Sequence, residues 1–125
     1  QIATGLVEGK PFFLLPAGPT AAFVAFEVFA RPAVLRLMGR TDVRRPEVGA
    51  VLDQPVSGPS GMALYVPVRL SHREGEWHAD PTGPAAPDRI GAMVQANGLA
   101  AVPPGDVEVP AGERVRVHVF RPLER

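Results

Sequence analysis

The stretch "MALYVPVRL", residues 62–70, alternates between two kinds of side chain. One face of an extended chain here would carry Met62, Leu64, Val66, Val68 and Leu70, and the opposite face would carry Tyr65 and Arg69. A period of two is typical of a β-strand with one face in a core. The stretch therefore predicts a long strand. Because proline cannot donate a backbone hydrogen bond, Pro67 predicts an edge position or a bulge.

Further short strands are predicted on both sides of this one. Their positions are Val48–Leu52 before it, Glu76–Asp80 after the turn Arg73-Glu74-Gly75, then Leu99–Val102, Asp106–Val109 and Arg114–Phe120, with a short helix from Asp88 to Gln95. In the last strand, Val115, Val117 and Val119 are expected to face inward. The 15 prolines and 13 glycines of the chain favour many turns over a helical bundle. Residues 46–125 therefore predict a small β-barrel or sandwich.

The N-terminal third has a different pattern. Strands are predicted at Ile2–Val7 and Pro11–Leu15, and the second, apolar on both faces, is typical of a strand covered on both sides. The turn Pro16-Ala17-Gly18-Pro19 follows, and helical spacing then runs to Met38. Residues 1–39 thus predict the last strand and helix of an α/β unit, and the charged stretch Arg40–Pro46 predicts a hinge before the β domain.

Proline and glycine mark the limits of the predicted helix. Gly18 suits an N-cap, and Pro19 suits the first helical position, where its missing N–H costs nothing. Pro32 is expected to kink the helix or to begin a second one, and Gly39 to end it. The helix is apolar on nearly every side, so we expect a second copy of the chain to cover part of it as a homodimer.

Composition argues against several classes of protein. Thirteen basic and thirteen acidic residues give zero net charge, so no nucleic-acid partner is expected. The longest apolar stretch, Thr20–Phe29, is far shorter than the ~20 residues of a membrane span, so no membrane partner is expected. No signal peptide is recognised. The absence of cysteine excludes disulfides and thiolate metal sites.

The side chains that commonly carry chemistry show no reactive pattern. His72, His78 and His118 lack the spacing of a zinc site and are interpreted as surface residues. Acidic residues such as Asp53 are interpreted as solvated carboxylates at turns and strand ends, and no serine lies in a nucleophile motif. No catalytic or metal-binding residue is therefore predicted.

The turn before the helix is the remaining candidate site. Backbone N–H groups at a helix start bind anions through their geometry and dipole, which makes phosphate or oxyanion binding possible at Ala17, Gly18 and Thr20. The alternative is a tight strand-to-helix turn that simply needs glycine and proline.

A series of motifs resembles one known family. "GKPFFLLPAGPTAAFVAFEVFARPAVLRLMG", residues 9–39, is similar to the part of the MoeA/gephyrin family, the molybdopterin molybdenumtransferases, that carries a strand, an L-P-G-N-P-V-S-A turn and a helix continuing E-x-F-x-R-P. The matching residues are Leu15, Pro16, Pro19, Ala22, Glu27, Phe29, Arg31 and Pro32. The motifs "YVPVRL", "ADP", "QANGLAAVPPG" and "AGERVRVHVF" then follow in the order of the family's C-terminal β domain.

The resemblance implies a function and a domain plan. The family inserts molybdenum from molybdate into adenylylated molybdopterin with magnesium, as a cytoplasmic homodimer. Residues 1–39 would then be the end of a molybdopterin-binding-like α/β domain whose remainder lies upstream, and residues 46–125 the C-terminal β domain. The implied cofactor-binding residues are Pro16, Ala17, Gly18, Pro19 and Thr20.

Departures from the family pattern leave alternatives open. Ala17-Gly18 replaces the family's Gly-Asn, Thr20-Ala21 replaces Val-Ser, and Ala85-Ala86-Pro87 replaces Gln-Gly-Ser. Most catalytic positions of the family lie upstream of Gln1, so this chain is expected to be inactive alone. One alternative is a non-catalytic binding module that kept the fold and lost the site. Another is an unrelated β domain whose helical arm docks on a partner.

Overall fold

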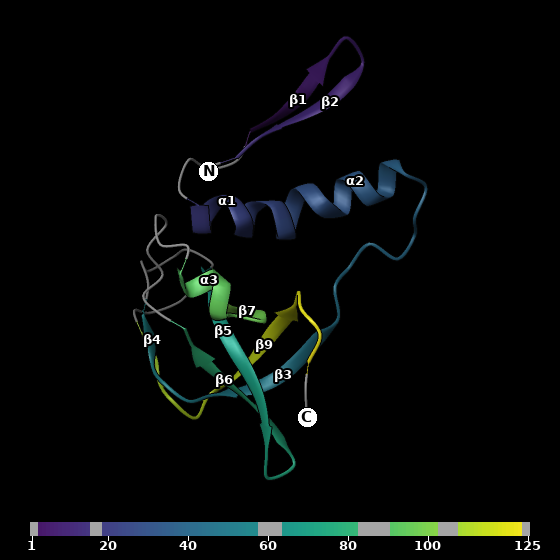
Figure 1. The fold of residues 1–125 in the computed structure, drawn as a ribbon. Helices are drawn as coiled ribbons and strands as arrows, with labels where there is room; N and C mark the ends of the chain where they lie inside the picture. The colour runs from purple at the N-terminus through teal and green to yellow at the C-terminus, as the bar shows by residue number, and fades with distance from the viewer. Residues whose placement is uncertain (1–2, 16–18, 58–63, 83–90, 103–107, 124–125) are drawn as a thin grey trace. The chain divides into compact units, whose positions relative to one another are not determined.

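The computed structural model describes residues 3–15, 19–57, 64–82, 91–102 and 108–123. The chain divides into two compact units, which are considered separately (Figure 1). The N-terminal unit holds residues 1–44 together with 86–90, and the barrel unit holds residues 45–85 and 91–125.

The N-terminal unit begins with an antiparallel hairpin of β1 (Ala3–Val7) and β2 (Lys10–Leu14). Glu8 and Gly9 between them have φ of 51° and 78°, the left-handed geometry of a two-residue type I′ turn. The predicted pair of strands is confirmed. The cover expected on both faces of β2 was assigned to sheet partners upstream and stays a prediction, since the two-stranded ribbon brings no covering layer of its own. Leu14 is 59% exposed.

The predicted helix is continuous from Pro19 but changes its winding in the middle. It runs through α1 (Pro19–Ala25), the π-helical η1 (Phe26–Ala30) and α2 (Arg31–Leu37). The N–H of Arg31 donates to the carbonyl of Phe26, five residues back. Pro32, which has no N–H to donate, lies in the first turn of α2. The wider turn thus precedes the proline, and the expectation of a second helix at Pro32 is confirmed.

The end of α2 is closed by its own backbone. Gly39 has φ of 87°, and its N–H donates to the carbonyl of Arg36 at 3.0 Å. The N–H of Arg40 donates to the carbonyl of Leu35 at 3.1 Å, which completes a Schellman motif and confirms Gly39 as the helix end. The guanidinium of Arg31 then binds the carbonyl of Val43 at 3.2 Å, so the coil after the helix is tied to it.

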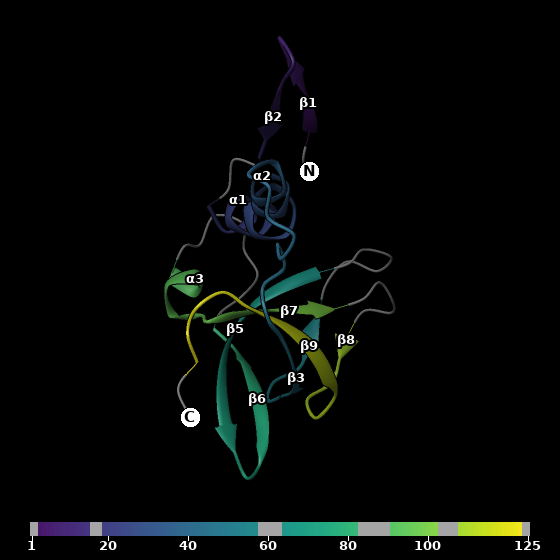
Figure 2. The ribbon, with the colours of Figure 1, turned by 90° about the vertical axis from the view of Figure 1, so that its right-hand side faces the viewer.

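The barrel unit is a closed sheet of five strands in the order β3-β6-β5-β7-β9 (Figure 2). The strands are β3 (Glu47–Leu52), β5 (Leu64–Arg73), β6 (Glu76–Pro81), β7 (Gly98–Val102) and β9 (Arg114–Val119). Neighbours are antiparallel except β3 and β6, which are parallel. A separate ribbon joins β4 (Val56–Ser57) to β8 (Glu108–Val109), and α3 (Gly91–Gln95) precedes β7. Of the two predicted architectures, the barrel is confirmed.

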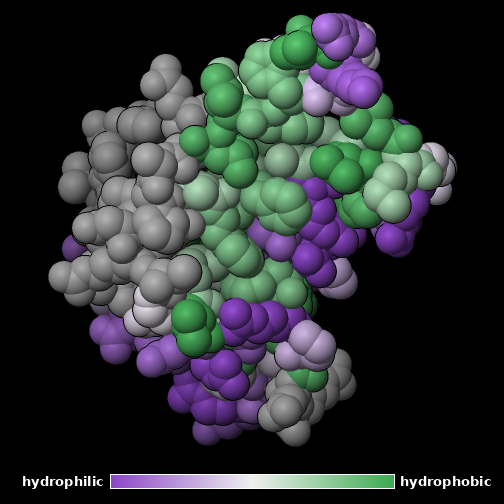
Figure 3. Space-filling model, turned by 45° about the horizontal axis from the view of Figure 1, so that its top comes forward, coloured by the Kyte–Doolittle hydropathy of each residue, from purple (hydrophilic) through white to green (hydrophobic). Residues whose placement is uncertain are grey.

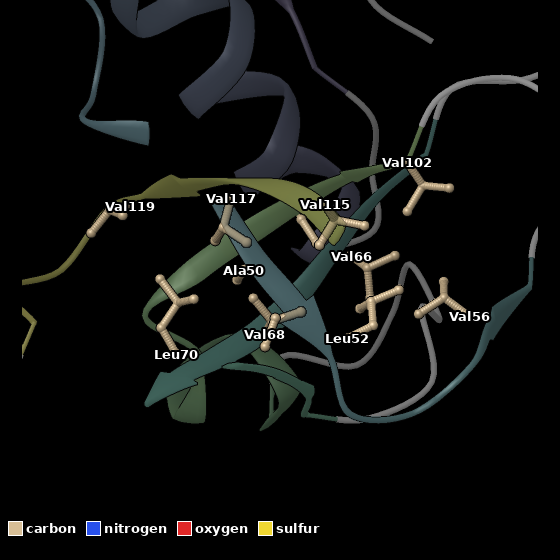
Figure 4. Close-up of a cluster of buried hydrophobic side chains, with 12 residues drawn as sticks. Ala50, Leu52, Val56, Val66, Val68, Leu70, Val102, Val115, Val117 and Val119 are labelled. Carbon is tan, nitrogen blue, oxygen red and sulfur yellow. The ribbon is translucent and has the colours of Figure 1, made fainter. Parts of the chain in front are cut away.

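The barrel core consists mainly of small branched side chains (Figure 4). Its buried residues are Ala50, Leu52, Val56, Val66, Val68, Leu70, Ala79, Ala100, Val102, Val115, Val117 and Val119. Residues that were predicted to face inward on β3, β5 and β9 are among these buried residues, which confirms the direction of those three faces. Valine suits such an interior because its branched side chain packs well on a pleated surface.

Pro67 lies inside a paired strand. The prediction of an edge strand or bulge is wrong, because β5 pairs with β7 on one side and β6 on the other. The pairing with β6 begins only at Val68, opposite Pro81, so Pro67 lies just past the last residue pair of that ladder. Its carbonyl accepts a hydrogen bond from the N–H of Thr82 at 3.2 Å.

Asn97 connects α3, β5 and the end of β9 from a buried position. Its side-chain oxygen accepts from the N–H of Leu70 at 2.7 Å, and its amide nitrogen donates to the carbonyl of Leu70 at 3.2 Å. Its own N–H donates to the carbonyl of Val68, and its carbonyl accepts from the N–H of Phe120. Asn97 thus acts as one additional partner beside β5, directly before β7 begins.

Among the described glycines, Gly98 leaves the least room for a side chain. A Cβ atom added there would lie 2.5 Å from Cγ1 of Val117 and 3.3 Å from the carbonyl oxygen of His118. We expect Gly98→Ala to lower the free energy of unfolding by about 1–3 kcal/mol through overpacking. Urea unfolding followed by the fluorescence of Trp77, the single tryptophan, measures the change.

Gly49→Ala is the matched control for this substitution. Gly49 lies in β3, and an added Cβ there meets no atom within 4 Å. We expect its effect to stay within about 0.5 kcal/mol. Equal unfolding midpoints for the two variants would contradict the close approach at Gly98.

Candidate functional site

The predicted cofactor-binding turn lies mostly beyond the described residues. Pro16, Ala17 and Gly18 fall outside them, and Pro19 and Thr20 are the first two residues of α1. The helix therefore begins where the prolines and glycine of the turn indicate. Anion binding by the backbone of this turn stays a prediction.

A polar depression of about 420 Å³ lies on the outer surface of the barrel unit. Its lining comes from β5, β6, the end of β3 and α3, and comprises Asp53, Arg69, Ser71, Arg73, Asp80, Pro81, Thr82 and Gln95. The period of two places Arg69, Ser71 and Arg73 on one face of β5. The strand register sets Arg69 opposite Asp80. The outward position of Arg69 was predicted, whereas its neighbours across the strands were not.

Asp53 is the most strongly engaged side chain of this depression. Its Oδ2 lies 2.5 Å from Nη2 of Arg73, and its Oδ1 lies 2.9 Å from Nδ1 of His78. The side chains of Asp53 and His78 are 27% and 20% exposed. Asp53 lies directly after β3, as predicted for the acidic residues, but its two contacts and the partial burial of His78 were not predicted. The three residues meet only through strand pairing, and no local motif indicates that pairing.

Two arginines bind the carboxyl end of α3. Arg69 donates to the carbonyl of Gln95 at 3.1 Å. Arg121 donates to the carbonyls of Val94 at 2.5 Å and Ala96 at 3.0 Å. Guanidinium groups at a helix C-terminus satisfy its last carbonyls and its dipole. Arg69 of β5 and Arg121, which follows β9, therefore hold the end of α3 in place.

A second depression, of about 370 Å³, lies over β3 and β9. It is lined by Glu47, Val48, Gly49, Arg114, Val115 and Arg116. Arg116 lies 3.7 Å from Glu47, and Arg114 pairs with Glu76 of β6. Both ion pairs are exposed, and such pairs contribute at most about 1 kcal/mol to the stability of the fold.

The described residues place no three histidine, aspartate or glutamate side chains where they could share a metal ion. Among the same residues, no helix combines the length and the apolar character needed to cross a membrane. The barrel surface thus offers hydrogen-bonding and charged groups for binding, most of them already engaged with one another.

The sequence is similar to one family and to several curated proteins. The model of the family described as "MoeA C-terminal region (domain IV)" matches residues 49–120. Molybdopterin molybdenumtransferase 2 of Mycobacterium tuberculosis is 37% identical over 113 residues, which cover 90% of this chain and 27% of that protein. Molybdopterin molybdenumtransferase 1 of the same organism is 34% identical over 115 residues, with 88% and 27% covered. The chain spans about a quarter of these relatives.

Solved structures show the same similarity. A molybdopterin biosynthesis MoeA protein from Pyrococcus horikosii has a TM-score of 0.73 and 28% identity, over 96% of this chain and 29% of that one. A molybdenum cofactor biosynthesis protein from Pyrococcus furiosus has a TM-score of 0.70 and 28% identity, over 94% of this chain and 40% of that one.

Proposed function

Because this chain belongs to the MoeA family, matching its C-terminal region, we propose that it is the C-terminal part of a molybdopterin molybdenumtransferase. The observation that carries the proposal is the 37% identity to molybdopterin molybdenumtransferase 2 over 90% of the chain. The parent protein would insert molybdenum from molybdate into adenylylated molybdopterin with magnesium in the cytoplasm. The chain would be inactive alone, since it spans 27% of that relative.

Within the parent, we assign different roles to the two units. Residues 1–39 would complete a molybdopterin-binding α/β domain, and the turn of Pro16, Ala17, Gly18, Pro19 and Thr20 would contact the cofactor through its backbone. Residues 46–125 would form the C-terminal β domain. The division of the chain between residues 44 and 45 supports this plan.

The exposed apolar surface of the N-terminal unit supports an interaction with two partners, the upstream part of the parent and a second copy of the chain. It includes Leu6 at 72%, Val7 at 57% and Leu14 at 59% exposure on the hairpin, and Phe29 at 57%, Leu37 at 65% and Met38 at 70% on the helical segment. Apolar residues are gathered on the face shown in Figure 3. Contiguous apolar surface of this kind marks an interaction site. The upstream part of the parent would cover some of it, and a second copy would complete a homodimer.

The full-length parent tests the proposed activity directly. Purified protein, given adenylylated molybdopterin, molybdate and magnesium, is expected to form molybdenum cofactor, measured by reconstitution of a cofactor-free molybdoenzyme. The 125-residue chain serves as the matched inactive control. Full-length protein that yields no molybdate-dependent product would overturn the proposed activity.

Restoring the family residues of the turn separates the enzyme from a non-catalytic module. In the full-length parent, the double variant Gly18→Asn, Ala21→Ser is expected to bind molybdopterin about thirtyfold more tightly, through two new side-chain hydrogen bonds. Each new side-chain hydrogen bond contributes about 1 kcal/mol. Calorimetric titration of molybdopterin into the wild-type parent and into the double variant measures the two affinities. Equal affinities, or no detectable binding to either protein, would favour the non-catalytic module that has lost its site.

The isolated chain is expected to form a dimer. Light scattering should give twice the 13.3 kDa mass of one chain. Leu37→Lys should raise the dissociation constant about tenfold or more, because it removes roughly 1.5–3 kcal/mol of apolar burial. Val94→Lys is the matched control, since Val94 is 61% exposed but belongs to the barrel unit. A monomer at every concentration would contradict the dimer.

A further inference from the structure

The junction between β3 and β6 is the shortest strand pairing in the described barrel. These strands share two residue pairs, Val51 with His78 and Leu52 with Ala79. By contrast, β5 and β6 share six pairs, and β3 and β9 share five. The short pairing is also parallel, which is slightly less stable per residue than antiparallel pairing. One further backbone hydrogen bond crosses the junction, from the N–H of Asp53 to the carbonyl of Ala79 at 2.9 Å.

The distal part of the β5–β6 hairpin, residues 71–79, extends beyond the other pairings of β5. The ladder between β5 and β7 ends at Val68, and Asn97 extends it to Leu70. In Figures 1 and 2 this hairpin projects from the rest of the barrel. We call residues 71–79, which include both β6 residues of the junction with β3, the flap. Within the flap, Ala79 is the buried core residue, and Trp77 is partly buried against the core.

The flap is itself a rigid unit. Glu74 and Gly75 at its tip have φ of 53° and 79°, the geometry of a type I′ hairpin turn. The rings of His72 and Trp77 pack edge to face with their centroids 5.0 Å apart. Movement at the junction would therefore displace the flap as a whole.

Asp53 joins the flap to the body of the barrel. It follows β3 directly, and its two carboxylate oxygens contact Arg73 and His78, which both belong to the flap. A second described ion pair joins Glu76 of the flap to Arg114 of β9, and the side chains of Arg114 and Glu76 are 66% and 47% exposed. The Asp53–His78 contact is half-buried and therefore less screened by water than the Arg114–Glu76 pair, whereas Arg73 is 55% exposed.

We propose that the flap is a mobile element that opens at the β3–β6 junction, pivots at Leu70, and is held closed by Asp53. The polar depression crosses this junction, because Asp53 comes from the β3 side, whereas Ser71 and Arg73 come from the flap. The depression is therefore complete only when the flap is closed. By mass action, any molecule that binds across it would stabilise the closed form.

Native-state hydrogen exchange of the 125-residue chain, measured by NMR, tests the proposal. The amide of Asp53 donates across the junction, so it should exchange faster than the protected amides of β7 and β9. Asp53→Asn keeps the shape and removes the charge. It should speed exchange at this amide by about tenfold to a hundredfold after correction for the intrinsic rate, and leave β7 and β9 unchanged.

Glu76→Gln is the matched control, because it removes the charge of the more exposed ion pair between the flap and the body of the barrel. It should change exchange at the Asp53 amide less than about fivefold. Acrylamide quenching of Trp77 gives an independent reading and should increase in Asp53→Asn only. If Asp53→Asn does not fold, the wild-type exchange rates decide.

Two results would overturn the proposal. One is an Asp53 amide as protected in the wild type as those of β7 and β9. The other is a folded Asp53→Asn variant in which all barrel amides exchange faster by the same factor, which would mean that the carboxylate stabilises the whole barrel and not the flap.

Discussion

Closing five strands around a narrow interior is the constraint from which the barrel unit follows. The space inside accepts valine and alanine at most of its positions, and at Gly98 it leaves no room for a Cβ atom beside Val117. Closure also requires β3 to lie beside β6 in a parallel direction, where only two residue pairs form. Because few backbone hydrogen bonds form at this junction, polar side chains add contacts across it, and Asp53 makes two of them, with Arg73 and His78.

Local signals in the sequence predicted the elements well. Alternation of apolar residues correctly predicted Val66, Val68 and Val117 in the core. The glycine at position 39 correctly predicted the end of the helix. Both signals act through residues that are close in the chain. Pairings across many residues were not accessible in this way. Pro67 was misplaced because the offset between β6 and β7 decides its neighbours, and the Asp53 contacts span 20 and 25 residues.

The candidate sites divide along the same line. The motif order from Leu15 to Pro32 and through the barrel identified the family, and the match over residues 49–120 confirms it. The polar depression was missed, because its residues come from four elements and no spacing rule joins them. Strand β2 was expected to be covered because it is apolar on both faces. A strand that is apolar on both faces predicts that both faces are buried against other residues. The pattern does not say which residues these are, and they need not belong to the same segment of chain.

The two ends of the barrel meet. The N–H of Val119 donates to the carbonyl of Pro46 at 2.9 Å, and Glu47 pairs with His118. The start of the first barrel strand and the end of the last thus lie at one place, an arrangement that favours domain insertion and circular permutation. The barrel strands therefore have the geometry of a cassette, which a surface loop of another protein could carry with short linkers and which could be reopened at a different turn.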